Sequence, residues 1–171
     1  HRADGRVGTA NYWLFIPTVF CENRNLEVLQ EALVTPLGYG RKKAYQNQAL
    51  KLIDLYQAGA DKNAILNAEI FIENQPEKAK RLFPNVDGIK FLNHDGGCGG
   101  IRQDSHSLAK LLAGYVNNPN VAGATVLSLG CQNAQTHILE DEIKKRSADF
   151  KKPLYILDQQ KVGTEADLLA L

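Results

Sequence analysis

The stretch "YWLFIPTVF" (residues 12–20) decides the fold of this 171-residue chain. It is a nearly continuous apolar run, and so are "GIKFLN" (88–93), "GATVLSLG" (123–130) and the shorter "PLYILD" (153–158). Apolar runs that do not alternate with polar residues indicate parallel strands covered on both faces. Because Pro17 has no N–H group to give to a ladder, we expect the first strand to bulge or to end early.

Helical patterns alternate with these runs, over residues 25–33, 105–116 and 138–150. Alternation of strands and helices predicts an α/β fold, with an open, mainly parallel sheet and helices on both faces in a Rossmann-like three-layer arrangement. Residues 39–85 contain helical runs but no strand-like run. We expect them to form a helical insertion that covers one side of the sheet.

Composition and charge exclude several classes of protein. The formal net charge is +1 and 23% of the residues are charged, which does not favour a nucleic-acid partner or a membrane surface. No run approaches the roughly 20 apolar residues of a membrane span, and no secretory signal pattern opens the chain. Three cysteines cannot all pair within one molecule, which favours a reducing, cytoplasmic location.

The two ends of the sequence predict a part of a longer protein. Residues 1–9, "HRADGRVGT", are typical of a connector between domains. At the other end, "GTEADLLAL" (163–171) starts a helix with a capping-box-like pair, Thr164 and Asp167, and runs for barely one and a half turns. We therefore expect residues 1–171 to be a single α/β domain cut from a longer chain.

A cysteine follows each of the first three predicted strands. Cys21, Cys98 and Cys131 would all lie at the carboxyl edge of an open parallel sheet, where such folds bind ligands. Free cysteines are often buried and inert, but three at equivalent strand ends favour a shared function. Thiolate and imidazole are good ligands for iron(II) or zinc, so Cys21, His94, Cys98 and Cys131 are the candidate metal ligands. No C-x-x-C pair is present, which excludes a zinc ribbon.

The same turns carry a repeated pattern. Cys21-Glu22-Asn23 and Cys131-Gln132-Asn133 share the sequence C-x-N, and a glycine precedes both Cys98 and Cys131. We expect Asn23 and Asn133 to contact a substrate.

The segment "NHDGGCGGIRQDSHSLAKLL" (93–112) adds polar groups at a helix start. Arg102 suits a carboxylate, and the helix N-terminus suits an anion. His94, Asp104 and His106 are candidates for proton transfer, although Asp104 could instead cap the helix. A metal, an anion pocket and a base together predict proton abstraction next to a carboxylate.

Three ordered motifs resemble the altronate and galactarate dehydratases: "GRVGTANYWLFIPTVFCEN" (5–23), "NHDGGCG" (93–99) and "VLSLGCQNAQ" (126–135). The resemblance implies the second domain of a longer, metal-dependent hydro-lyase. Such an enzyme removes water from a sugar acid, altronate above all, and gives a 2-keto-3-deoxy acid with Fe2+ or Mn2+. The family's signature positions match Cys21, His94, Cys98 and Cys131. The implied partners are the sugar acid and the remaining domains of the same enzyme.

The sequence departs from the family at Ala10, where arginine is usual, and at Gln132, where glutamate is usual. Other interpretations stay open. The chain could belong to a lyase for galactarate or for a sulfonated hydroxy acid, or it could be a thiol-rich binding domain without catalysis. An iron–sulfur cluster on the three cysteines is the alternative to a mononuclear ion.

Overall fold

The computed structural model describes residues 1–2, 5–40, 44–68 and 80–169. Its elements along the chain are β1 (Tyr12–Pro17), the 3-10 helix η1 (Phe20–Glu22), α1 (Asn23–Leu33), α2 (Ala44–Gln57), α3 (Lys62–Leu66), β2 (Gly88–Phe91), α4 (Arg102–Asn117), β3 (Val121–Ser128), α5 (Thr136–Arg146), β4 (Leu154–Asp158), α6 (Gln159–Val162) and α7 (Thr164–Leu169).

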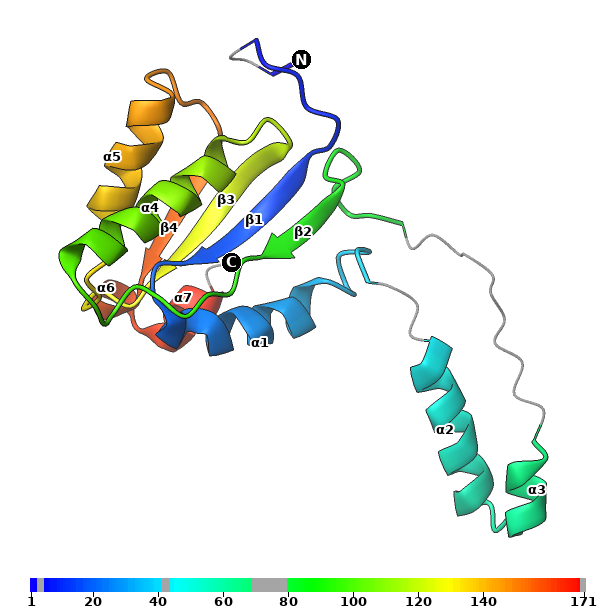
Figure 1. The fold of residues 1–171 in the computed structure, drawn as a ribbon. Helices are drawn as coiled ribbons and strands as arrows, with labels where there is room; N and C mark the ends of the chain where they lie inside the picture. Colours follow the sequence, from blue (N-terminus) through cyan, green and yellow to red (C-terminus); the bar gives the residue numbers. More distant parts are fainter. Residues whose placement is uncertain (3–4, 41–43, 69–79, 170–171) are drawn as a thin grey trace.

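The four strands form one sheet in the order β2-β1-β3-β4, and every neighbouring pair is parallel (Figure 1). The predicted α/β fold with an open parallel sheet is thus confirmed. Strand β1 ends at Pro17, as expected from the missing N–H group, and its pairing with β3 shifts register between Tyr12 and Trp13. All four carboxyl ends therefore meet at one edge of the sheet.

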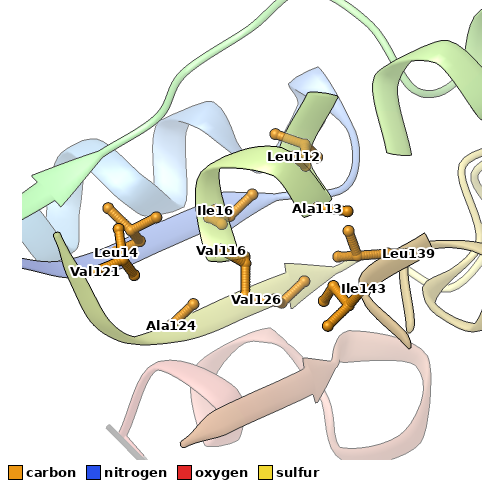
Figure 2. Packing of buried hydrophobic residues seen from close by; sticks show 10 residues of the cluster. All are labelled: Leu14, Ile16, Leu112, Ala113, Val116, Val121, Ala124, Val126, Leu139 and Ile143. Carbon is orange, nitrogen blue, oxygen red and sulfur yellow. The ribbon is translucent and has the colours of Figure 1, made fainter. Parts of the chain in front are cut away.

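The larger core lies between the sheet and helices α4 and α5 (Figure 2). Alternate residues of a strand point to opposite faces, and Leu14 and Ile16 of β1 point to this face. The other buried members of the cluster come from α4, β3 and α5: Leu112, Ala113, Val116, Val121, Ala124, Val126, Leu139 and Ile143. Those on α4, Leu112, Ala113 and Val116, have the spacing of a single apolar stripe along the helix.

A second core lies on the opposite face of the sheet, under α1. Phe15 and Leu127 pack there against Leu26 and Leu29 of the helix. The ring of Phe15 also stacks on that of Phe91, with 5.0 Å between the centroids. Helices thus cover both faces, which gives the three predicted layers.

The helices of the insertion do not lie where the sequence predicts. Helices α2 and α3 pack against each other and stand apart from the sheet in Figure 1, so the described part of the insertion does not cover a side of the sheet. Tyr45 and Tyr56 on α2 are 82% and 75% exposed. Residues 69–79 of the predicted insertion lie outside the described residues. Among the helices that the structure describes, none combines the length and the apolar character that crossing a membrane requires.

Candidate functional site

The carboxyl edge of the sheet carries the three cysteines. Cys21 lies in η1 after β1, Cys98 in the loop after β2, and Cys131 in the turn after β3. All three side chains are exposed and none forms a disulfide. The parallel topology therefore presents three free thiols along one edge.

The glycine loop, defined here as residues 93–100, lies between the turns that follow β1 and β3. The backbone N–H of Phe20 donates to the carbonyl of Gly96 at 2.9 Å, and the N–H of Ala134 donates to the carbonyl of Gly97 at 3.0 Å. The turns after two neighbouring strands, β1 and β3, thus both donate hydrogen bonds to the loop.

Gly97 explains why this loop needs glycine. Its φ is +103°, which L side chains rarely adopt. A Cβ atom there would lie 2.2 Å from the carbonyl oxygen of Thr18. Any other residue at position 97 would push the loop away from the turn after β1.

His94 is half-buried and anchored by its ring. Its Nε2 lies 2.8 Å from the carbonyl oxygen of Pro17, and the backbone N–H of Gly96 lies 3.2 Å from Nδ1. A carbonyl oxygen can only accept, so the proton sits on Nε2 and Nδ1 accepts from Gly96. Both ring nitrogens are thus engaged with the backbone, and binding a metal would break one of these bonds.

The two C-x-N asparagines also bind the glycine loop. The side-chain Nδ2 of Asn23 donates to the carbonyl of His94 at 2.9 Å, and Oδ1 of Asn23 lies 3.4 Å from the N–H of His94. Nδ2 of Asn133 donates to the carbonyl of Cys98 at 2.6 Å. Their predicted contacts with a substrate stay a prediction.

The middle residues of the two motifs are buried. The sequence analysis noted Gln132 as a departure from the family but predicted no site role for either residue. Glu22 and Gln132 are 0% and 1% exposed. Oε2 of Glu22 accepts from Asn25 and from Gln159, both at 2.8 Å. The signal that could have found the pair is its shared place between a cysteine and an asparagine.

The first turns of α4 place Arg102 and His106 on one face of the helix and Asp104 on another. Arg102, Asp104 and His106 are all exposed. The N-cap of α4 is Ile101, and Oδ2 of Asp104 in the first turn accepts from its N–H at 3.2 Å, so Asp104 helps to cap the helix from inside it. Arg102 and His106 are four residues apart and share a face of the helix, whereas Asp104 is two residues from each and does not.

These residues do not fit a complete metal site. Within the part of the chain that the structure describes, no three His, Cys, Asp or Glu side chains come together closely enough to hold a metal ion. The ring of His94, which is hydrogen-bonded at both nitrogens, agrees with that result. The four predicted ligands thus do not form a finished site in this chain alone.

Comparison with known proteins gives a family match over almost the whole chain. Residues 1–170 match the family described as D-galactarate dehydratase/altronate hydrolase, second domain. The altronate dehydratase of Bacillus subtilis (strain 168) is 24% identical over 80 residues, which is 45% of this chain and 16% of that relative. No solved structure matches the chain significantly.

Proposed function

We propose that this chain, which belongs to the D-galactarate dehydratase/altronate hydrolase family as its second domain, forms one side of a site where a hydro-lyase dehydrates a sugar acid. One observation carries the proposal. The segments of the three family motifs are hydrogen-bonded to one another at the carboxyl edge of the sheet, where open α/β folds bind their ligands.

The reaction removes a proton from the carbon next to the carboxylate and a hydroxyl group from the carbon after it. The two leave as water, and the resulting enol becomes a 2-keto-3-deoxy acid. The protein must therefore bind a carboxylate and accept a proton close to it. Altronate is the substrate that we favour, because the matched relative carries that name.

Two residues on α4 suit these tasks. Arg102 can bind the carboxylate through a forked, charge-assisted pair of hydrogen bonds. His106 lies one turn further along the same face and is exposed, so its imidazole can accept the proton. Asp104 and His94 are the alternatives for the base, but each already has a structural partner at 3.2 Å or less.

The proposal assigns no chemical step to a metal. Iron(II) or manganese(II) stays a prediction, and it requires ligands beyond those that the described residues bring together. Anaerobic metal analysis of the longer enzyme, beside its Cys98→Ser variant, tests it. We expect the enzyme to contain a bound transition metal and the Cys98→Ser variant to contain less of it. The same metal content in the enzyme and in its Cys98→Ser variant would contradict a role for the glycine loop in metal binding.

The activity test uses the longer enzyme that contains this domain, with altronate, galactarate and a sulfonated hydroxy acid as substrates. We expect His106→Gln to lower kcat about 10²- to 10⁴-fold, the usual contribution of a general base, and Arg102→Met to raise KM. His137→Gln is the matched control, because His137 is also exposed but lies on α5.

The outcomes separate the alternatives. Release of sulfite from the sulfonated acid, with no dehydration of altronate, would show that the substrate is the sulfonated acid and not altronate. A wild-type enzyme that converts none of the three acids would favour a thiol-rich binding domain. Full activity of His106→Gln would exclude His106 as the base.

A further inference from the structure

We propose that Asn23 and Asn133 are positioning residues that hold the glycine loop at its two ends and so fix Cys98 at the sheet edge. The kinetic part of this inference rests on the proposed function, whereas the structural part does not. The C-x-N pattern is then a clamp that occurs twice, once after β1 and once after β3.

The first clamp holds the loop where it leaves β2. Nδ2 of Asn23 donates to the carbonyl of His94 at 2.9 Å, and its Oδ1 faces the N–H of the same residue at 3.4 Å. A side-chain amide that meets both backbone groups of one residue fixes the direction of the chain there. The ring of His94 adds a bond to the end of β1 through Pro17.

The second clamp holds the loop just before α4. Nδ2 of Asn133 donates to the carbonyl of Cys98 at 2.6 Å. The next residue, Ala134, donates its backbone N–H to Gly97 at 3.0 Å. Two successive residues of the β3 turn thus hold two successive residues of the loop.

Burial of the middle residue sets the orientation of each clamp. Glu22 and Gln132 are almost wholly inaccessible, while the cysteine before each of them is exposed. The turn therefore cannot rotate without breaking the hydrogen bonds of its buried side chain. The asparagine stays directed at the loop as a consequence.

The test combines hydrogen exchange with kinetics in the longer enzyme. In Asn133→Ala we expect the backbone amide of Ala134, which donates to Gly97, to exchange about tenfold faster, the factor that the loss of one hydrogen bond allows. In Asn23→Ala the same is expected of Phe20, which donates to Gly96. Residue-resolved mass spectrometry measures both, and core amides of β3 should not change.

Asn67→Ala is the matched control. Asn67 is exposed on the insertion, and its Nδ2 also donates to a backbone carbonyl, that of Asn63 at 2.8 Å. We expect this variant to leave the amides of Phe20 and Ala134 unchanged.

Kinetics distinguish positioning from direct contact with a substrate. A misplaced loop lowers kcat by about 10- to 100-fold and leaves KM nearly constant, whereas loss of a substrate contact raises KM. Unchanged exchange at Phe20 and Ala134, or a rise in KM at constant kcat, would overturn the inference. If the wild-type enzyme dehydrates no sugar acid, the proposed function fails, and the exchange result still decides whether the clamps exist.

Discussion

The two C-x-N turns share a sequence pattern but hold their middle residue in different ways. Glu22 reaches across the sheet, since one of its donors is Gln159, which follows β4 and lies 137 residues away in the chain. Gln132 stays within its own turn: its Oε1 accepts from the N–H of Gly130 and its Nε2 donates to Oγ of Ser128, both at 2.7 Å.

The difference follows from the chemistry of the two side chains. Oε2 of Glu22 accepts from side chains on two different elements, Asn25 of α1 and Gln159 of α6. A primary amide both donates and accepts, so it can close a turn by itself. The β1 turn therefore depends on tertiary contacts with α6, whereas the β3 turn is locally satisfied.

Replacing Gly97, which contacts the β1 turn, should have the largest effect. In Gly97→Ala, the strained φ and the 2.2 Å approach to Thr18 should together cost about 2–4 kcal/mol of unfolding free energy. Gly99→Ala is the control, because a Cβ there meets nothing within 4 Å. Urea unfolding of both variants measures the difference, and equal effects would show that the loop is not held against Thr18.

The fold could be predicted because its signals are local. Four apolar runs and the helical stripes between them predict a parallel sheet with two covered faces, and Pro17 predicts the end of β1. The placing of the insertion could not be predicted, because the apolar residues of α2 indicate a helix but not its partner. Leu50 and Ile53 of α2 stay about half exposed.

The candidate site was predictable only in part. Strand ends place the cysteines at one edge, since topology alone decides that. The partners of individual side chains depend on backbone carbonyls, which no sequence pattern reveals: the ring of His94 meets Pro17 and Gly96, and Asn133 meets Cys98. Nothing in the sequence around Gln159 predicts its hydrogen bond to Glu22.

The second prediction exchanges the chemistry of the β3 turn. In Gln132→Glu, the acceptor for Gly130 survives and the hydroxyl of Ser128 can turn to donate, but an ionised carboxylate becomes buried. We expect a loss of about 1–3 kcal/mol at neutral pH. Burial raises the pKa of a carboxyl group, so the loss should shrink as the pH falls and the group takes up its proton. Thermal or urea unfolding at several pH values checks this, and a loss independent of pH would point to packing instead.

The smallest effect is expected where the β1 turn meets α6. Gln159→Ala keeps the bond between Glu22 and Asn25 but removes the donor that ties the turn to the end of β4, and with it the acceptor for Oγ of Thr164. We expect a cost of about 0.5–1.5 kcal/mol. Gln30→Ala, on an exposed position of α1, is the control.

The location of the change matters more than its size. If Glu22 depends on tertiary contacts, Gln159→Ala should speed amide exchange in the β1 turn, at the N–H of Glu22 that donates to Val19, and leave the N–H of Gln135 in the β3 turn unaffected. Equal acceleration in both turns would mean that they open together. The two C-x-N turns would then form a single unit around the loop, and the contrast between a carboxylate and an amide would have no energetic consequence.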